Sequence, residues 1–197
     1  LDWINLTSTT AGVILDLSTT VTAGTGVYAG SYSQALVVDA TPLDNADNTQ
    51  FDYIRQIENI TGSSGDDTFT GNASQNSILA GAGDDIIYYT RGLDYYDGGN
   101  HTTSSGQGSG TPSVGGGDWI SLAKETTTTV NFDLYNSSVG ANITNSSATV
   151  TNIENIIGYN GVQATTGWGS TGNNTFVMYD GGDNIIGRQG NEVYDIG

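Results

Sequence analysis

Aspartates recur at a fixed spacing behind glycine-rich stretches, and they are the residues of this chain best suited to binding a metal. The stretch GSSGDDTFT occupies residues 62–70 and AGAGDDIIY occupies residues 80–88, so Asp67 and Asp85 are eighteen residues apart. Carboxylate and carbonyl oxygens favour hard cations such as Ca²⁺ over transition metals. One aspartate behind a glycine is usually a turn residue. The shared register is what makes these two aspartates candidate ligands.

Both stretches belong to a repeat of nine residues, with Asp, Asn or Glu at the sixth place and a large apolar residue at the eighth. Rows begin at residues 62, 71, 80 and 89, and the register returns at 178 and 187, after a partial row with Asn174 and Phe176. The sixth places are Asp67, Asn76, Asp85, Asp94, Asp183 and Glu192, and the eighth are Phe69, Ile78, Ile87, Tyr96, Ile185 and Tyr194. Such internal repetition predicts stacked units.

A row of this kind combines a glycine-rich turn with a short strand, so that two rows make one flattened coil. Stacked coils pair as parallel strands about 4.8 Å apart. Asp85 is then expected above Asp67 on one edge and Asp94 above Asn76 on the other, with the eighth places in the core. Stacked carboxylates repel one another unless a cation lies between the turns. Asp66 and Asp84, at fifth places, are expected to face solvent.

A longer repeat encloses the short one, because DWINL at Asp2 recurs as DWISL at Asp118, and IENITG recurs as IENIIG. Gly98 and Gly99 begin a row that Asp118 and Ile120 would complete, and Asp2 has the place of a sixth residue. We therefore expect one continuous solenoid over residues 1–197, cut from a longer chain. Its parts are a lead-in (1–61) with a loop near 23–48, a first block (62–97), an inserted loop (98–117), a second lead-in (118–158) and a second block (159–197).

The rows resemble the calcium-binding nonapeptide of the RTX (repeats-in-toxin) family, whose consensus is Gly-Gly-x-Gly-x-Asp-x-U-x. The resemblance implies an all-β, right-handed parallel β-roll or β-helix with several Ca²⁺ ions between its turns. It points to Asp67 and Asp85, continuing to Asp118, and then to Asp183. Further candidates are Asp2, Gly65, Gly83, Asn76, Asp94 and Glu192. Asparagine at sixth places departs from the consensus and weakens the Asn76/Asp94 and Asn174/Glu192 sites.

The composition restricts the partners. With 4 Lys+Arg and 21 Asp+Glu among 197 residues, the formal charge is −17, which argues against nucleic acids and anionic membranes. Bound cations are the natural source of neutralising charge. The absence of cysteine excludes disulfides and Cys-based zinc sites. No apolar run reaches the ~18 residues needed to span a bilayer. Clusters of Val, Ile, Tyr and Thr with only 2 prolines favour strands over disorder.

An enzyme is not expected. The single histidine, His101, lies in the Gly/Ser/Thr-rich segment, and the basic residues Arg55, Arg91, Lys124 and Arg188 are scattered. The RTX resemblance implies a structural or adhesive calcium-binding module, located outside the cell or on a bacterial surface, exported unfolded by a type I system. Two alternatives stay open: a glycan- or surface-binding accessory module of a secreted enzyme, and a self-assembling surface-layer or matrix subunit. Self-association or an extracellular polysaccharide would be the corresponding partner.

Overall fold

The fold is built from short strands. The computed structural model describes residues 2–23, 30–38, 52–54, 56–100, 117–124, 130–134, 138–141, 147–159, 164–179 and 182–196. Within these ranges all regular structure is β, with no helix. The predicted all-β class is confirmed.

The strands fall into two series. The first comprises β1 (Trp3–Asn5), β2 (Gly12–Ala23), β3 (Gly30–Val38), β4 (Asp52–Ile54), β5 (Asn59–Thr61), β6 (Thr68–Thr70), β7 (Ser77–Ala82), β8 (Ile86–Tyr88) and β9 (Tyr95–Asn100). The second comprises β10 (Trp119–Ser121), β11 (Val130–Asp133), β12 (Ser138–Ala141), β13 (Ser147–Thr151), β14 (Asn155–Ile157), β15 (Thr166–Trp168), β16 (Thr175–Met178), β17 (Asn184–Ile186) and β18 (Val193–Ile196).

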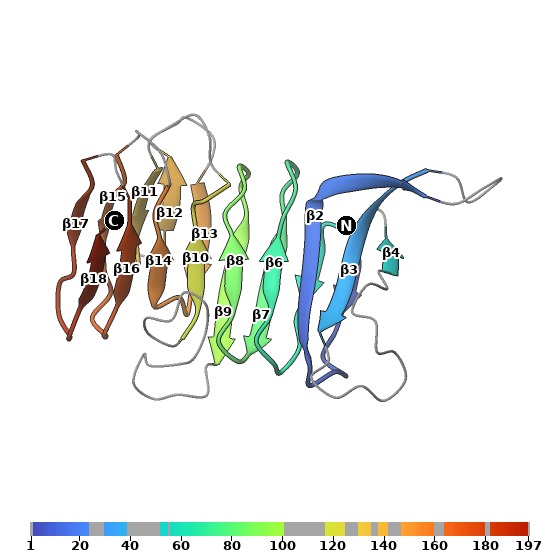
Figure 1. The fold of residues 1–197 in the computed structure, drawn as a ribbon, viewed down its shortest axis with the longest axis horizontal. Helices are drawn as coiled ribbons and strands as arrows, with labels where there is room; N and C mark the ends of the chain where they lie inside the picture. The colour runs from blue at the N-terminus through green and yellow to red at the C-terminus, as the bar shows by residue number, and fades with distance from the viewer. Residues whose placement is uncertain are drawn as a thin grey trace.

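These strands form two sheets that run along the molecule (Figure 1). Sheet A has the order β1-β5-β7-β9-β13-β12-β11-β15-β17, and sheet B has the order β18-β16-β14-β10-β8-β6-β2-β3-β4. From β5 to β9 the chain alternates between the sheets. Phe69 pairs with Ile87 in sheet B and Ile78 pairs with Tyr96 in sheet A, both in parallel strands. The expected stacking of residues eighteen apart is therefore confirmed, and the arrangement is consistent with a β-roll.

The core lies between the two sheets and consists of the eighth-place side chains. Phe69, Ile78, Ile87 and Tyr96 are fully buried, as expected, and Ile185 is partly buried. Tyr194 differs, because it is 45% exposed. Its ring stacks on Phe176 on one side, at 5.3 Å between centroids, and its strand β18 pairs only with β16. Tyr194 lies in the last of the described coils, where Phe176 packs on one face of its ring.

Two antiparallel insertions interrupt the parallel coils. Strands β2, β3 and β4 pair antiparallel at one end of sheet B, and β11, β12 and β13 do so within sheet A. β3 lies inside the segment 23–48, so that predicted loop contains a strand; the other residues after Ala23, up to 29 and from 39 to 48, lie outside the described ranges, as do 101–116 of the predicted insertion. Alternating buried residues such as Val13 and Leu15 favour these strands, although they follow no nine-residue period.

The core has one unusual position, Gly167, an eighth place paired with Ile185. A methyl group on Gly167 would overlap the ring of Phe132, which fills the missing side-chain volume. We expect Gly167→Ala to destabilise the fold by about 1–3 kcal/mol, because overpacking a full core forces neighbours to move. Thermal unfolding should show this. Gly172→Ala is the matched control, since its methyl group would approach only Ser170, at 3.6 Å. Equal losses in both variants would contradict the packing explanation.

Candidate metal centre

Sixth-place residues of sheet B lie one above another in the turns before their strands. The backbone N–H of Asp67 donates to Oδ1 of Asp85 at 2.7 Å, and that of Asp85 donates to Oδ1 of Asp118 at 2.8 Å. The N–H of Asp118 donates to Oε2 of Glu154 at 2.9 Å. Asn174 N–H donates in the same way to Glu192. We call this row, Asp67, Asp85, Asp118, Glu154, Asn174 and Glu192, the sheet B ladder. Each carboxylate accepts a hydrogen bond from a main-chain N–H of the neighbouring coil.

An equivalent sheet A ladder joins Asp2, Glu58, Asn76 and Asp94. Asp2 N–H donates to Oε2 of Glu58 at 2.9 Å, and Asn76 N–H donates to Oδ1 of Asp94 at 2.8 Å. Asp183 continues the pattern beyond the antiparallel insertion, where its Oδ1 accepts the N–H of Thr165. The structure thus brings Asp67, Asp85 and Asp118 together on one edge, and Asn76 and Asp94 on the other, as the spacing predicts. Gly83 lies over Gly65. A methyl group on Gly83 would lie 2.8 Å from the carbonyl oxygen of Gly65.

Sequence reasoning missed two ladder residues, Glu58 and Glu154. Both lie in the Ile-Glu-Asn-Ile motif, at the sixth place of rows whose eighth places are the buried Ile60 and Ile156. The signal was present, because Glu58 precedes Asp67 by nine residues. The expectation for Asp84 also needs correction: Asp66 is exposed, but Asp84 is half-buried and its Oδ1 accepts the N–H of Gly117 at 3.1 Å.

Some ladder residues satisfy their hydrogen bonds within the chain. Both oxygens of Asp67 accept hydrogen bonds: Oδ2 from Ser63 N–H at 2.7 Å, and Oδ1 from Val13 N–H and the Ser63 hydroxyl. The Asn76 amide donates to the carbonyl of Glu58 at 2.9 Å, and the Asn174 amide donates to that of Glu154 at 2.7 Å. These coils need no additional ligand for their sixth-place atoms.

Other ladder residues keep a buried oxygen without a partner. Oδ2 of Asp85 and Oδ2 of Asp118 are buried and accept no hydrogen bond, and the same holds for Oδ2 of Asp183 and Oε1 of Glu192. The second residue of the row is Ser63 for Asp67, but Gly81 for Asp85 and Gly99 for Asp118, with φ of +120° and +99°. Ser63 donates its N–H to the carboxylate of its own row, whereas neither glycine does.

Burial has a strong electrostatic consequence at Asp85 and Asp118. Removal from water, together with the neighbouring carboxylates, raises the pKa of each side chain from 3.8 to about 8. For Asp85 the neighbouring charges are Asp67, Asp66 and Asp84. Burial also raises the pKa of Asp67, but the hydrogen bonds from Ser63 and Val13 oppose that shift. The Asp85 and Asp118 pair is therefore where a bound cation would relieve most repulsion.

The residues around this pair fit a hard cation. A methyl group on Gly98 would lie 2.6 Å from Oδ2 of Asp118 and would overlap the carbonyl oxygen of Asn152, so an unpartnered carboxylate oxygen and a carbonyl oxygen converge there. Both are ligands that Ca²⁺ prefers. No group of three or more His, Cys, Asp or Glu side chains close enough to hold an ion is found in the described ranges.

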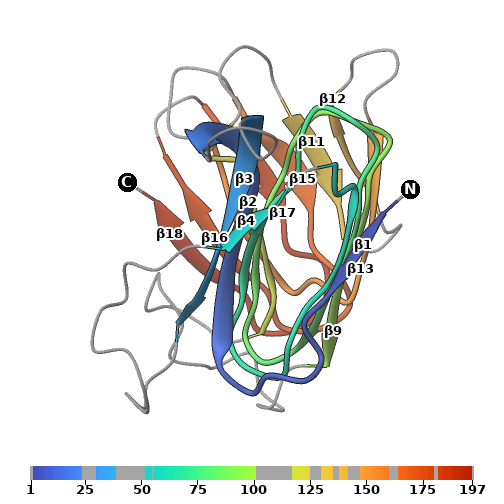
Figure 2. The same cartoon turned by 90° about the vertical axis from the view of Figure 1, so that its right-hand side faces the viewer.

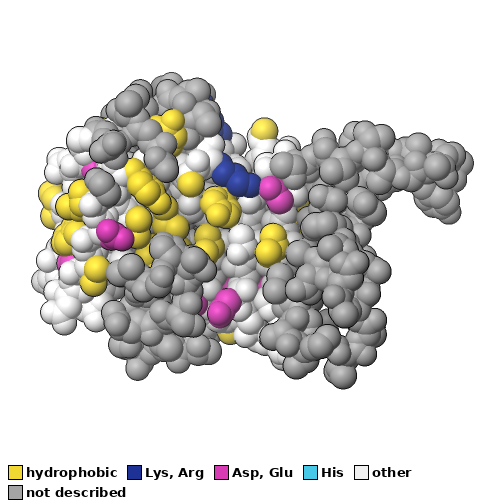
Figure 3. Space-filling model, in the orientation of Figure 1, with side chains coloured by type: hydrophobic (Ala, Val, Ile, Leu, Met, Phe, Trp, Pro, Cys, Tyr) yellow, Lys and Arg dark blue, Asp and Glu magenta, His cyan; other side chains and the backbone are white. Residues whose placement is uncertain are grey.

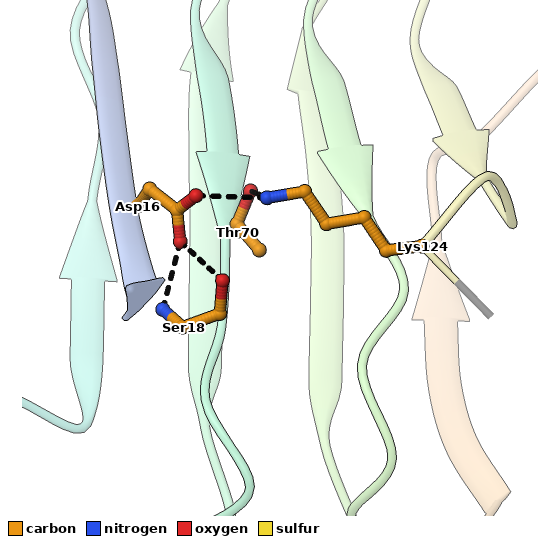
Figure 4. A network of polar contacts seen from close by, with 4 residues as sticks. All are labelled: Asp16, Ser18, Thr70 and Lys124. Carbon is orange, nitrogen blue, oxygen red and sulfur yellow. Dashed lines mark hydrogen bonds and ion pairs between the residues drawn. The ribbon is translucent and has the colours of Figure 1, made fainter. Parts of the chain in front are cut away.

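Two basic residues of the described chain pair with aspartates of other strands. Lys124 reaches across β8 and β6 to β2, where Nζ lies 2.8 Å from Oδ2 of Asp16 and 3.0 Å from Oγ1 of Thr70 (Figure 4). Burial acts to raise the pKa of Asp16, but hydrogen bonds from Lys124 and Ser18 and the lysine charge hold it below its ordinary value. Arg188 pairs with Asp133 at 3.1 Å. His101 lies outside the described residues.

Comparison with known proteins agrees with the register. Residues 61–96 match the RTX calcium-binding nonapeptide repeat, in 4 copies. This part of the chain consists of RTX repeats, and the resemblance seen in the first block is confirmed. The second block lies outside the matched residues, and strand pairing places it in the same two sheets. Among curated proteins, none matches this chain. Of the residues described, none forms a helix long and apolar enough to cross a membrane.

Proposed function

We propose that this chain is a calcium-dependent structural or adhesive module, which folds when Ca²⁺ enters the spaces between its stacked turns. The observation that carries the proposal is the pair of buried, unpartnered oxygens on Asp85 and Asp118. Two adjacent buried carboxylates are costly unless they are neutralised. In this proposal the finer architecture is a right-handed β-roll, with Asp85, Asp118 and turn carbonyls as the principal ligands and Asp183 and Glu192 as further ones.

Ion binding would act mainly on folding. The formal charge of −17 keeps the ion-free chain expanded through self-repulsion. Because the ladder oxygens come together only in the folded coil, the free energy of binding Ca²⁺ adds to the stability of the folded state. A module that stays unfolded at low Ca²⁺ and folds at high Ca²⁺ suits export into an extracellular medium, so we place the protein outside the cell or on its surface.

The test is a Ca²⁺ titration of chelator-treated protein, followed by far-UV circular dichroism, with Mg²⁺ as the control ion. We expect a coil-to-β transition that Mg²⁺ does not produce. Asp85→Ala should move the midpoint to much higher Ca²⁺, whereas Asp84→Ala and the exposed Asp66→Ala should move it little. Equal shifts for Asp85→Ala and Asp84→Ala would show that the sixth-place carboxylate is not the calcium ligand. A chain already folded in chelator would overturn the calcium proposal.

Catalysis is not part of this proposal. Two of the described cations, Lys124 and Arg188, hold aspartates of neighbouring strands. Of the two tryptophans in the repeated Asp-Trp-Ile motif, Trp119 is 1% exposed and Trp3 is 51% exposed, so the motif does not present both rings for stacking on a sugar. We therefore favour the structural or adhesive role over the accessory module of an enzyme. No turnover is expected with polysaccharide or ester substrates.

A further inference from the structure

A hollow lies at one edge of sheet B, among the turns of neighbouring coils. Its volume is about 540 Å³, and the side chains that line it include Ser18, Asn72, Tyr89, Thr90, Arg91 and Lys124. We call it the sheet B hollow. These residues lie in β2 and in the turns that follow β6, β8 and β10, which are consecutive strands of sheet B with β3 and β14 on either side. The hollow is therefore formed by inner coils of the described chain.

The register places two basic side chains at this hollow. Tyr88 of β8 pairs with Ser121 of β10. Arg91 and Lys124 each follow three residues later, so they have the same place in successive coils, which lie one behind another along the long axis (Figure 2). Two of the four Lys and Arg residues of the chain thus line the hollow, and none of the 21 Asp and Glu residues is among the described residues that line it. In Figure 3, dark-blue side chains gather in the upper middle of the face, by the turns that follow β6 and β8.

The charges at the hollow favour an anionic group. Lys124 Nζ is held in one position, 2.8 Å from Oδ2 of Asp16 and 5.0 Å from the ring centroid of Tyr88. Arg91 is exposed, and its guanidinium group has five N–H donors, so it can donate to a ligand as well as to the chain. A planar guanidinium binds a carboxylate through two parallel hydrogen bonds. The formal charge of −17 opposes this only weakly, because charges more than about 8 Å away are largely screened at physiological ionic strength.

The uncharged side chains of the hollow are fixed by contacts within the chain. The Oδ1 atom of Asn72 accepts the N–H of Ser74 at 2.8 Å. The hydroxyl oxygen of Thr90 lies 3.2 Å from that of Tyr96. Tyr89 lines the hollow but is only 1% exposed, so it lies at the bottom. A site that keeps its shape without a ligand loses little conformational entropy when the ligand binds.

We propose that the sheet B hollow binds an acidic sugar, a uronic acid unit of an extracellular polysaccharide. Arg91 binds its carboxylate, while the hydroxyl groups of Ser18 and Thr90 and the amide of Asn72 bind the sugar hydroxyl groups. A single small anion would leave most of the volume empty, and that volume is in the range of ~300–1,000 Å³ usual for small-molecule sites. The inference rests on the proposed adhesive function, because it names the class of partner.

Solution NMR of the Ca²⁺-loaded chain tests the class of ligand. The probe is cellobiouronic acid, a disaccharide of glucuronate and glucose, and its matched control is cellobiose, which has a CH₂OH group in place of the carboxylate. The amide signals of Asn72, Thr90 and Arg91 should shift and saturate with the acid. Cellobiose should bind about tenfold more weakly or worse, because it makes no charged hydrogen bonds. Equal binding of both disaccharides would overturn the acidic class, and the absence of a saturable shift with either would overturn the site.

Two pairs of variants test the residues. Arg91→Gln should weaken binding of the acid about tenfold or more, whereas Arg188→Gln removes the same charge at the ion pair with Asp133 and should leave binding unchanged. Ala73→Phe should abolish binding without a change of charge, because Ala73 lines the hollow. Gln75→Phe, at an exposed position that is not among the described lining residues, is its control. Equal losses within either pair would overturn the placement of the site, and full binding by Arg91→Gln would overturn the role of Arg91.

Circular dichroism of the same samples separates this inference from the calcium proposal. A β spectrum in Ca²⁺ without sugar binding would overturn the sugar site alone. Sugar binding by a chain that is folded in chelator would support the site and overturn the calcium proposal. A coil spectrum in Ca²⁺ would overturn both, because the hollow exists only where the turns are stacked.

Discussion

In excess chelator, lowering the pH from about 8 to about 4 is expected to convert the chain from coil to β-sheet. Folded Asp85 and Asp118 keep their protons up to a pKa of about 8, whereas the unfolded chain releases them near 3.8. Between these values the folded state binds more protons, so stability falls as pH rises. The stabilisation is complete below about pH 4 and lost by about pH 8. A difference of about four pH units is on the order of 5 kcal/mol for one group.

With Ca²⁺ bound, the pH dependence should have the opposite sign, because protons and the ion compete for the same oxygens. Urea unfolding at a series of pH values, in chelator and in Ca²⁺, measures both slopes. The two stability curves should converge in mildly acidic solution, because protonation of the carboxylates removes the stabilisation by Ca²⁺ there. If the chelated chain were most stable at neutral pH, the buried carboxylates would not be the source of its instability.

The stacking could be read from the sequence because it depends only on period. A coil of eighteen residues places Asp85 over Asp67 whatever the side chains between them, and the structure contains that contact. Glu58 was overlooked because its row, YIRQIENIT, lacks the glycines that mark the other turns. The segment that contains β3 was assigned to a loop because the first half is longer than the second between the Asp-Trp-Ile and Ile-Glu-Asn-Ile motifs. β3 pairs antiparallel with β2, an arrangement that the nine-residue period does not predict.

The difference between satisfied and unsatisfied ladder residues was not predictable from the register. Asp67 and Asp85 have the same place in equivalent rows, but only Asp67 receives the N–H of its second residue. The deciding feature is backbone conformation at that second residue, which is Ser63 in one row and Gly81 in the other. Glycine permits positive φ without requiring it, so sequence alone leaves both conformations open.

Replacing Asp85 and Asp118 together by asparagine is expected to let the chain fold in chelator at neutral pH. Asn76 and Asn174 show how such a side chain is accommodated, since each amide donates to a carbonyl of the preceding coil. The corresponding acceptors are the carbonyls of Asp67 and Asp85. The change removes two buried charges and fills the unpartnered positions. We expect stability in chelator to rise by several kcal/mol and the gain on adding Ca²⁺ to shrink by a similar amount.

The reverse substitution, Asn76→Asp, is expected to create an additional calcium requirement in a coil that needs no ion when asparagine is at this place. Asn76 N–H already donates to Asp94, so a carboxylate at position 76 would be buried beside that of Asp94, without the amide bond to Glu58. Two facing carboxylates then need a cation, as Asp85 and Asp118 do. The difference in unfolding free energy between saturating Ca²⁺ and chelator should increase in this variant. Gln75→Glu is a control for added charge alone, since Gln75 is adjacent in sequence but exposed. If both variants changed that difference equally, net charge and not the ladder geometry would set the calcium dependence.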